Sequence, residues 1–457
     1  MEIKRDIKKN IFRGYDIRGI YPTELDEDTV YTIGLGFGSY IKELGKTKCI
    51  VGHDNRLSSP SLYKALIQGI TETGIDVMAL GLCTTPMYYY ACIKLKIYSG
   101  VMVTASHNPK DDNGLKFAFD EKGNCKGQEI QDFLEYILRG NFSKGEGSVV
   151  EYIIANDYIK LFKESLNFGN RKVKVVIDPG NGTTSIIAKE LYNSFPMELI
   201  EINGESDGSF PNHHPDPCVE DNLIQLKQKV LETNADLGLG FDGDGDRMGL
   251  ITNSGKFIPT DRYMALFIRD MINKVDKKEF LYDVKCSKAL KDEIEKLGGK
   301  GICYRSGNSY TKAATRDLDL PFGGELSGHV YFRDKFPGFD SGLYAGLRVV
   351  EILSNTDKSL DQLLEGINEY YSTPEIKVPS PDEIKFEVVN KVIEYIKTKG
   401  YNYLDIDGAR VEFDDSWALI RASNTGPNLT LRFEATTKER LEEIQKEFTD
   451  KVEEFNK

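Results

Sequence analysis

The stretch KCIVGHDNRLSSPSLYKALIQGITETGIDVMALG, residues 48–81, decides the fold class. It begins and ends with short apolar runs, 48–52 and 77–81, which are typical of buried strands. Between them, residues 59–73 place apolar side chains at helical spacing, which predicts an amphipathic helix. A strand, a helix and a strand in this order predict a βαβ unit with parallel strands and a right-handed crossover.

The same pattern returns along most of the chain. Further short apolar runs predict strands at 101–104, 173–178, 235–241, 248–252 and 280–284. The pattern restarts twice, near residues 173 and 280, although no close sequence repeat accompanies it. The sequence therefore predicts three α/β units in series.

The last part of the chain has a different pattern. Residues 373–383 are rich in proline and predict a linker with little helix or strand character. A helix is expected at 386–398, and a charged helix closes the chain. Strands are expected at 409–413, 417–422 and 429–433. This order predicts a small α+β domain with an antiparallel sheet.

Length and composition narrow the class of protein. A chain of 457 residues is too long for one core, so three or four domains are expected. A net charge of −13 disfavours nucleic acid as a partner. The N-terminal segment is polar, and no apolar run is long enough to cross a bilayer. Seven cysteines without a C-x-x-C pair favour a reducing compartment, so we expect a cytoplasmic protein without a membrane partner.

The strongest local signal is GFDGDGDRMGL, residues 240–250. Asp242, Asp244 and Asp246 alternate with glycines between two predicted strands, so a curved loop can turn three carboxylates toward one point. Converging hard oxygen ligands suit Mg²⁺. A solvated acidic turn is the plain alternative. An EF-hand is excluded, because its sixth and twelfth positions would be Arg247 and Asn253 instead of glycine and glutamate.

A serine follows another predicted strand, in VMVTASHNP at 101–109. We expect Ser106 to be exposed at the edge of the sheet, with room for a phosphate. The S-H-N sequence alone is a weak signal, since a loop Ser-His pair is more often structural, and no G-x-S-x-G elbow supports a hydrolase. Two other patterns are interpreted as structural. GLGFGS at 34–39 predicts helix packing instead of a dinucleotide site, and the His213-His214 pair predicts a loop between domains.

Taken together, the motifs resemble the α-D-phosphohexomutase superfamily, and most closely its phosphomannomutase/phosphoglucomutase branch. They occur in order over nearly the whole chain. The motifs are IFRGYDIRG (11–19), TASHNP (104–109), FPNHHPDP (210–217), FDGDGDR (241–247), DVKC (283–286), GGELSGH (323–329) and RASNTGPNLTLRFE (421–434), which runs into LRFEATT (431–437). The resemblance implies an α/β fold with three tandem related α/β domains with mixed sheets around a central cleft, plus a C-terminal α+β domain. The expected domains are 1–153, 154–256, 257–369 and 370–457.

The activity implied by the resemblance is interconversion of hexose 1-phosphate and hexose 6-phosphate, with mannose, glucose or both as the sugar. The implied route passes through phosphoserine and a hexose 1,6-bisphosphate, which serves as intermediate and activator, and it requires Mg²⁺. Phosphosugars are then the partners, and the chain is expected to be a monomer or a weak dimer. The local basic groups would attract phosphate to an otherwise acidic protein.

The resemblance also assigns roles to individual residues. The implied Mg²⁺ ligands are Ser106, through its phosphate, with Asp242, Asp244 and Asp246. The implied catalytic residues are Ser106, His107, Lys116, Arg247, Tyr15 and Arg18, with Lys116 a candidate general acid or base. The implied substrate-binding residues are Arg262, Lys285, Asn308, Glu325, Ser327, His329, Arg421, Ser423, Asn424 and Thr425.

Other functions remain open at this stage. Leu326 and the RASNTGP loop argue against a phosphoglucosamine or N-acetylglucosamine phosphate mutase without deciding the matter. A phosphoserine-dependent sugar phosphatase and a non-catalytic sugar-phosphate sensor are the alternatives of another class. Asn308 occupies a position where relatives commonly carry histidine. Because a neutral amide cannot act as a general base, we expect Asn308 only to hydrogen-bond the substrate.

Overall fold

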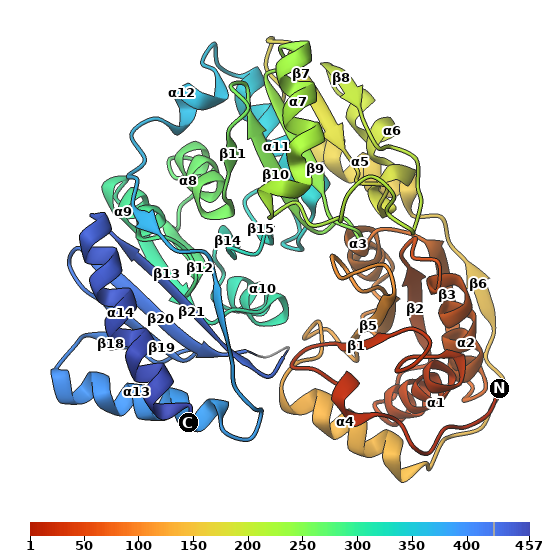
Figure 1. Cartoon of the computed structure of the whole chain (residues 1–457). Helices are drawn as coiled ribbons and strands as arrows, with labels where there is room; N and C mark the ends of the chain where they lie inside the picture. The colour runs from red at the N-terminus through yellow and green to blue at the C-terminus, as the bar shows by residue number, and fades with distance from the viewer. Residues whose placement is uncertain (424–425) are drawn as a thin grey trace. The chain divides into compact units, whose positions relative to one another are not determined.

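The computed structural model describes residues 1–423 and 426–457, and Asn424 and Thr425, predicted to bind substrate, lie outside the described residues. The chain forms two compact units, each made of two separate segments. Figure 1 labels the helices and strands along the chain. The first unit contains residues 1–259 and 327–363, and the second contains 260–326 and 364–457. The four domain boundaries expected from the sequence stay a prediction, because these units are a coarser division.

The stretch that opens the sequence analysis forms the predicted βαβ unit. Strand β2 (Lys48–His53), helix α2 (Ser59–Thr71) and strand β3 (Asp76–Leu82) follow one another, and β2 and β3 pair in parallel. They belong to a sheet with the order β1-β5-β4-β2-β3-β6. Its other strands are β1 (Ile17–Ile20), β4 (Gly100–Val103), β5 (Asp112–Ala118) and β6 (Val149–Glu151). The sheet is mixed, because β5 runs antiparallel to both β4 and β1.

Helices α1 (Glu27–Glu43), α2 and α4 (Gln128–Arg139) share one hydrophobic core with this sheet. The glycines of 34–39 lie inside α1. A Cβ atom on Gly34 would lie 2.6 Å from the Leu66 carbonyl oxygen, and one on Gly69 would lie 2.3 Å from that of Tyr31. These glycines therefore let α1 and α2 approach closely, which confirms the packing interpretation of GLGFGS. Helix α3 (Thr85–Leu95) contacts β2 and β4.

A second sheet of the first unit has the order β11-β10-β9-β7-β8. Its strands are β7 (Val173–Asp178), β8 (Met197–Glu201), β9 (Leu237–Phe241), β10 (Met248–Thr252) and β11 (Phe257–Ile258). β9 and β10 form an antiparallel hairpin, whereas β7 pairs in parallel with β8 and β9. The helices of this region are α5 (Ala155–Ser165), α6 (Ala188–Asn193), α7 (Ile224–Thr233) and α11 (Gly342–Ser354). Helix α11 is buried along its whole length and contacts β7, β9 and β10.

The second unit holds a parallel arrangement of β13 (Lys300–Tyr304), β12 (Glu279–Asp283) and β14 (Phe322–Gly324). Its helices here are α8 (Thr260–Met271), α9 (Lys288–Lys296) and α10 (Asn308–Asp317). The remaining short elements of the chain are η1 (Lys9–Ile11), η2 (Thr183–Ile186), η3 (Glu220–Leu223), β15 (Val330–Phe332) and α12 (Leu360–Leu364). The restart of the α/β pattern near residue 280 is thereby confirmed.

The C-terminal sheet is antiparallel, as predicted. Its strands are β16 (Tyr371–Ser372), β17 (Ile376–Pro379), β18 (Tyr403–Leu404), β19 (Ala409–Glu412), β20 (Ser416–Ala422) and β21 (Asn428–Ala435), with helices α13 (Lys385–Lys399) and α14 (Lys438–Phe455). The expectation of little strand character at 373–383 is wrong for β17, which pairs with β21. Pro379 ends this strand opposite Asn428, a position at which the missing N–H of proline is tolerated.

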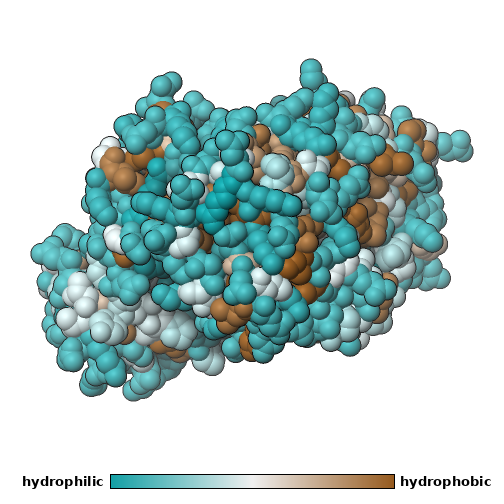
Figure 2. All heavy atoms as spheres, turned by 90° about the horizontal axis from the view of Figure 1, so that it is seen from above, coloured by the Kyte–Doolittle hydropathy of each residue, from teal (hydrophilic) through white to brown (hydrophobic). Residues whose placement is uncertain are grey.

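The described surface agrees with the composition. In the view of Figure 2 the visible face is mostly hydrophilic, with hydrophobic side chains in small separate patches. Among the described residues, no helix combines the length and the apolar character that crossing a membrane requires.

Candidate active site

Ser106 follows β4 and lies at the carboxyl end of a parallel strand. Its backbone is left-handed, with φ at 51°, and its amide donates to Thr104 Oγ1 at 2.8 Å. The side-chain hydroxyl donates to Asp242 Oδ2 at 3.0 Å. The expectation of an exposed serine is wrong, since only 1% of Ser106 is accessible. The reason is the acidic loop, which covers it: a Cβ on Gly243 would lie 2.4 Å from the Ser106 carbonyl oxygen.

The acidic loop connects β9 to β10, so strands flank it, as expected when the EF-hand was excluded. Asp242, Asp244 and Asp246 are all fully buried, and each offers a carboxylate oxygen within 4.8 Å of the others. The amides of Gly245 and Arg247 donate to Asp242 Oδ1 at 3.0 and 3.1 Å. The loop therefore turns the three carboxylates toward one point, as the alternating sequence predicts, and the solvated acidic turn is excluded.

Two cations from different elements offset this negative charge. Lys116 on β5 donates to Asp244 Oδ2 at 2.8 Å and to Asp246 Oδ2 at 2.7 Å. Arg247 Nε lies 3.8 Å from Asp242 Oδ2 and 3.7 Å from Asp246 Oδ1. Burial acts to lower the pKa of Lys116, but Asp244 and Asp246 outweigh burial and raise that pKa well above its usual value. Lys116 is therefore a firmly held cation in this arrangement.

The carboxylates respond differently to the same environment. Burial, with the charges of Asp246 and Asp244, raises the pKa of Asp242 well above its usual value. Burial and Asp246 act in the same direction on Asp244, but Lys116 and Thr85 hold the pKa of Asp244 below its usual value. Thr85 Oγ1 donates to Asp244 Oδ2 at 2.6 Å, and Thr104 Oγ1 does so at 3.2 Å. Of the three carboxylates, Asp242 has the least compensation, and it is the one that accepts from Ser106.

The donor set fits a divalent cation. Among the residues the structure describes, Asp244 Oδ1 and Asp246 Oδ1 accept no hydrogen bond, although both side chains are fully buried. Buried carboxylate oxygens without a donor are costly, and they are the hard ligands that Mg²⁺ prefers. The acidic loop therefore forms a candidate cation site next to the Ser106 hydroxyl.

The other predicted residues of the first unit lie close to this centre. His107 Nδ1 is 3.4 Å from Ser106 Oγ, and burial, reinforced by Arg247 and Arg18, lowers the pKa of His107 well below its usual value. Arg18 donates to Asp16 Oδ2 at 2.8 Å and interacts electrostatically with Asp244. Tyr15 is half-buried and interacts electrostatically with Arg18.

The end of the GGELSGH motif also reaches the acidic loop. His329 Nδ1 lies 3.6 Å from Asp246 Oδ1 and 3.0 Å from Asp340 Oδ2, and all three residues are buried. The Ser327 carbonyl accepts a hydrogen bond from the Cys218 thiol at 3.2 Å. The sequence analysis missed Asp340. An acidic residue 11 positions after His329 is the signal that could have indicated it.

In the second unit the predicted residues form a separate polar group. Lys285 Nζ pairs with Glu375 at 2.9 Å, and Arg421 Nε pairs with Asp407 at 3.0 Å. Burial acts to lower the pKa of Lys285, but Glu375 and Asp283 raise it, and Arg421 is near enough to oppose them. Glu325 Oε1 accepts from the Gly307 amide at 2.5 Å, directly before Asn308 at the start of α10. Sequence reasoning missed Glu375 because it lies in the segment expected to be a linker.

Arg262 lies elsewhere in this unit. It donates to the carbonyl oxygens of Asn368 and Ile367 and lies 3.5 Å from Glu369. These contacts tie helix α8 to the segment that leads into the C-terminal sheet. A role in substrate binding stays a prediction for Arg262.

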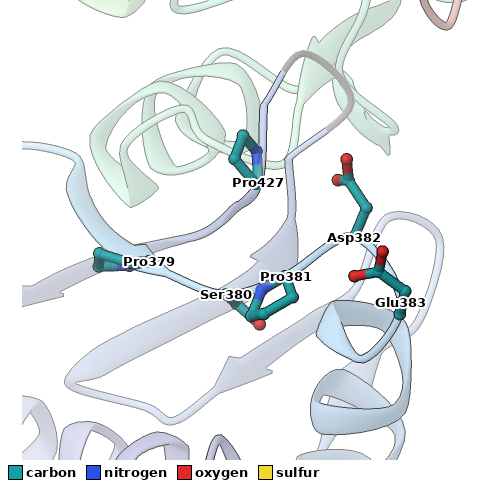
Figure 3. A pocket seen from close by; sticks show the side chains of 6 residues that line it. All are labelled: Pro379, Ser380, Pro381, Asp382, Glu383 and Pro427. Carbon is teal, nitrogen blue, oxygen red and sulfur yellow. The ribbon is translucent and has the colours of Figure 1, made fainter. Parts of the chain in front are cut away.

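Ser423 begins the loop predicted to hold phosphate, and Lys385 supports that loop. Lys385 Nζ is buried and donates to the Ser423 carbonyl at 2.7 Å, to the Gly426 carbonyl at 3.1 Å and to Asp382 Oδ1 at 2.6 Å. No motif marks this lysine, because it lies in a helix 38 residues before Ser423. Figure 3 shows a neighbouring pocket lined by Pro379, Ser380, Pro381, Asp382, Glu383 and Pro427. Its two acidic side chains make it unsuitable for a phosphate.

The His213-His214 pair behaves as a structural loop. His213 Nε2 lies 3.1 Å from Asp178 Oδ2, and His213 Nδ1 lies 3.0 Å from the His214 carbonyl. Burial acts to lower the pKa of His213, but Asp178 outweighs it and raises that pKa. Among the residues that the structure describes, neither histidine takes part in a candidate metal group.

Comparison with known proteins assigns families to four successive parts of the chain. Four families match in order: the phosphoglucomutase/phosphomannomutase alpha/beta/alpha domains I, II and III at residues 9–143, 156–255 and 259–370, and the C-terminal domain at 375–451. The chain is 41% identical over 437 residues to a phosphomannomutase/phosphoglucomutase of Pseudomonas syringae pv. tomato, covering 95% of this chain and 93% of the relative.

Two further relatives extend the comparison. The chain is 38% identical over 452 residues to a phosphoglucomutase of Neisseria meningitidis serogroup A, covering 98% of each chain. A crystal structure of a phosphoglucomutase/phosphomannomutase family protein from Burkholderia thailandensis matches with a TM-score of 0.90 and 36% identity, covering 99% of this chain and 98% of the other.

The chain matches all four domain families in order and places a buried serine hydroxyl beside three buried carboxylates, which defines the class as that of the phosphohexose mutases. Within this class, the chain belongs to the phosphoglucomutase/phosphomannomutase family.

Proposed function

We propose that this enzyme interconverts hexose 1-phosphate and hexose 6-phosphate, with glucose and mannose phosphates as substrates. Phosphorylated Ser106 gives its phosphoryl group to the sugar, and the resulting hexose 1,6-bisphosphate returns its other phosphoryl group to Ser106. The observation that carries this proposal is the 3.0 Å contact between the Ser106 hydroxyl and Asp242 of the buried acidic loop. The names of the relatives support the choice of sugars.

The acidic loop would hold Mg²⁺ through Asp242, Asp244 and Asp246, with a phosphate oxygen on Ser106 as a further ligand. The cation would offset the charge of phosphoserine, about −1.5 to −2 at neutral pH, next to three carboxylates. Arg247 and Lys116 add fixed positive charge on the same side. Phosphoryl transfer depends mainly on such positioning and charge neutralisation.

The proton of the reacting hydroxyl needs a separate acceptor and donor. Lys116 was the candidate from the sequence, but its raised pKa and two ion pairs favour charge neutralisation as its role. The lowered pKa of His107 leaves a neutral imidazole 3.4 Å from Ser106 Oγ. We propose that His107 takes the serine proton when Ser106 accepts a phosphoryl group and returns a proton to Ser106 Oγ when that group leaves, and that Tyr15 and Arg18 hold the transferring group.

The other predicted residues would bind the substrate. Lys285, Glu325, Ser327 and His329 would contact the sugar. Arg421, Ser423, Asn424 and Thr425 would hold the phosphate that does not react, because a guanidinium, hydroxyls and an amide are suitable donors for it. Arg262 would also contact the substrate.

The cysteines bear on the compartment in which the enzyme acts. All seven cysteines are free, and most are buried, which agrees with a reducing cytoplasm. We propose that the enzyme acts there as a monomer or a weak dimer on small phosphosugars.

A substrate panel tests the proposed function. The 1-phosphates of glucose, mannose, glucosamine and N-acetylglucosamine are each incubated with Mg²⁺ and a trace of hexose bisphosphate, and the 6-phosphates are quantified. We expect the glucose and mannose compounds to isomerise. Conversion of only the amino sugars would assign the other mutase activity. Release of inorganic phosphate as fast as isomer formation would indicate a phosphatase, and no reaction with any compound would leave only a sensor.

Asn308 provides a second, smaller prediction. Replacing it with alanine removes one hydrogen bond to the sugar but no general base. We therefore expect turnover to fall by less than about 10²-fold, which is less than the contribution usual for general acid–base catalysis. The measurement is kcat with saturating glucose 1-phosphate. A loss of about 10⁴-fold would show that this amide takes part in the chemistry.

A further inference from the structure

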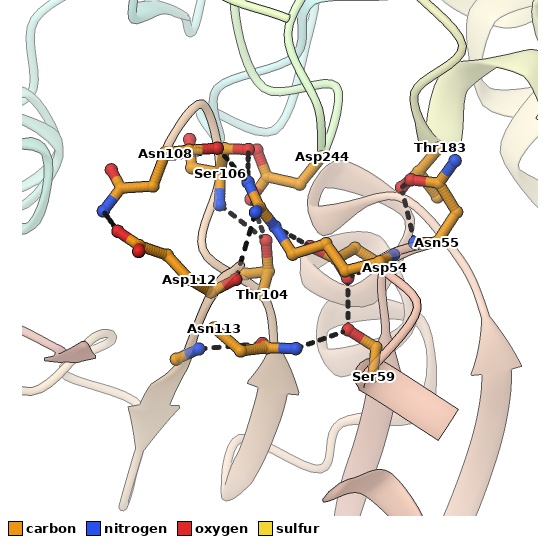
Figure 4. A network of polar contacts seen from close by, with 12 residues as sticks. Asp54, Asn55, Ser59, Thr104, Ser106, Asn108, Asp112, Asn113, Thr183 and Asp244 are labelled. Atoms are coloured by element: carbon orange, nitrogen blue, oxygen red, sulfur yellow. Dashed lines mark hydrogen bonds and ion pairs between the residues drawn. The ribbon is translucent and has the colours of Figure 1, made fainter. Parts of the chain in front are cut away.

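Arg56 is a fully buried arginine that neither the motifs nor the proposed chemistry explains. It follows β2, and its guanidinium donates to the loop that carries Ser106. Figure 4 shows Ser106, Asn108 and Asp112 of this loop, together with Asp54 of the segment after β2. Nη2 donates to the carbonyl oxygens of Ser106 at 2.8 Å and Asn108 at 2.7 Å. Nη1 donates to those of Pro109 at 2.5 Å and Asp112 at 3.0 Å.

One side chain thus binds four main-chain carbonyls of a seven-residue loop, 106–112. Only arginine carries enough N–H donors in a rigid planar fork to do this. Its remaining side faces Asp54, with Nε 3.2 Å from Oδ2, and Asp54 is fixed in turn by the Ser59 hydroxyl at 2.5 Å. The contact with Asp54 therefore holds the guanidinium in place on the side that does not contact the loop.

The loop needs such support because Ser106 is strained. A left-handed backbone is unfavourable for a residue with a Cβ, and it persists only where the surroundings fix it. The Ser106 carbonyl oxygen is enclosed on two sides, by Arg56 Nη2 at 2.8 Å and by the Gly243 backbone, which leaves no room for a Cβ. Contacts at this carbonyl hold the backbone from which the Ser106 hydroxyl reaches Asp242.

The same segment also fixes the acidic loop. The Asn55 amide donates to Thr183 Oγ1 at 3.1 Å, and the Thr183 amide donates to the Gly243 carbonyl at 2.9 Å. On another side, the ring centroid of Phe210, from the FPNHHPDP motif, lies 5.4 Å from Arg56 Cζ. Residues 54–56 therefore contact, directly or through one residue, both the nucleophile loop and the loop that would hold the cation.

We infer that Arg56 is a positioning residue for phosphoryl transfer: it holds the Ser106 loop in its left-handed form, in register with the acidic loop. This inference rests on the proposed function, because it takes Ser106 as the phosphoryl carrier. Arg56 is 0% exposed and its guanidinium donates to four main-chain carbonyls, so we place it outside direct contact with the sugar. It acts on the transition state through the placement of Ser106.

The test compares Arg56→Lys with Arg348→Lys, a matched control. Arg348 is also fully buried in the first unit, but its partners are Asp334 and Glu351, away from Ser106. Lysine keeps the charge at either site and loses the planar fork. We expect Arg56→Lys to lower kcat by about 10²-fold, the scale of a small misplacement of reacting groups. KM for glucose 1-phosphate should change little, and Arg348→Lys should leave both constants near those of the wild type.

A second measurement follows the serine directly. Dephosphorylated enzyme is mixed with hexose 1,6-bisphosphate, and intact mass follows the gain of one phosphoryl group in a single turnover. We expect this step to slow in Arg56→Lys as kcat does. Gly243→Ala should slow it too, since its Cβ displaces the same carbonyl from the opposite side. If Arg56→Lys does not accumulate as folded protein, the Gly243→Ala result alone decides.

The outcomes separate this inference from the proposed function. Wild-type enzyme that neither isomerises a hexose phosphate nor carries phosphate on Ser106 would refute the proposed function. If the wild type is active and both Arg56→Lys and Gly243→Ala keep its kcat and phosphorylation rate, the role of Arg56 is refuted and the proposed function stands. An equal loss of kcat in Arg348→Lys would show that only general core stability is involved.

Discussion

Replacing Ser106 with alanine is expected to lower kcat by about 10⁴-fold or more, the scale of removing a covalent nucleophile. The hydroxyl is the only part removed, and it lies 3.0 Å from Asp242 Oδ2. The fold should persist, because alanine keeps the backbone contacts of Ser106 with Arg56 and Thr104. The measurements are isomer formation from glucose 1-phosphate and the phosphate content of the purified protein by intact mass.

Ser99→Ala provides the control for this loss. Ser99 is equally buried at the other end of β4, where its hydroxyl donates to the Phe119 carbonyl at 2.6 Å. We expect this variant to isomerise substrate normally and to retain one phosphate. Residual turnover of Ser106→Ala within tenfold of the wild type would show that the phosphoryl group does not pass through this serine.

Removing the divalent cation is expected to stop turnover, and Asp242→Asn is expected to lower kcat by about 10²–10³-fold, the scale reported for lost transition-state charge stabilisation. The same cation should stabilise the fold. A ligand that binds only the native state at 100 times its Kd adds about 2.7 kcal/mol to the free energy of unfolding. We therefore expect Mg²⁺ to raise the Tm of the wild type and to raise that of Asp242→Asn far less.

The unloaded protein gives the opposite order of stability. Asp242 is the carboxylate whose pKa burial and its neighbours raise, so it is the least favourable charge in the loop. Without cation, Asp242→Asn should be at least as stable as the wild type in a thermal melt. Asp178→Asn is the control, a fully buried aspartate on β7 that pairs with His213. A wild-type Tm that does not respond to Mg²⁺ would contradict the site, and so would loss of the Mg²⁺ response in Asp178→Asn.

Much of the fold was predictable because its elements depend on local patterns. Apolar runs of four to six residues predicted β2, β3, β4, β7 and β10 within about two residues, the usual uncertainty of element ends. The antiparallel pairing of β19, β20 and β21 was also predicted. Strand β17 was not, because prolines weaken the local signal and only its pairing with β21 makes it a strand.

In the candidate active site, too, features with a local sequence pattern were predictable and features that depend on distant segments were not. Alternating aspartates and glycines are a local signal, so the convergence of Asp242, Asp244 and Asp246 could be predicted. The burial of Ser106 could not, because it depends on the approach of a loop more than 130 residues away in the sequence. Arg56 and Lys385 were missed for a related reason. Each donates to main-chain carbonyls, and because every residue has a carbonyl, no residue type in the sequence indicates such a contact.

Helix α11 has a consequence for synthesis of the protein on the ribosome. The strands β7, β9 and β10 that it contacts are complete by Thr252, but α11 ends only at Ser354. At about 5–20 residues per second, the ribosome needs about 5–20 s to make the intervening chain. During that interval α7 can pack on these strands, but the sheet surface that α11 contacts in the folded protein has no such helix. Newly made chains should therefore be most prone to aggregation, and most in need of a chaperone, between these two points of translation.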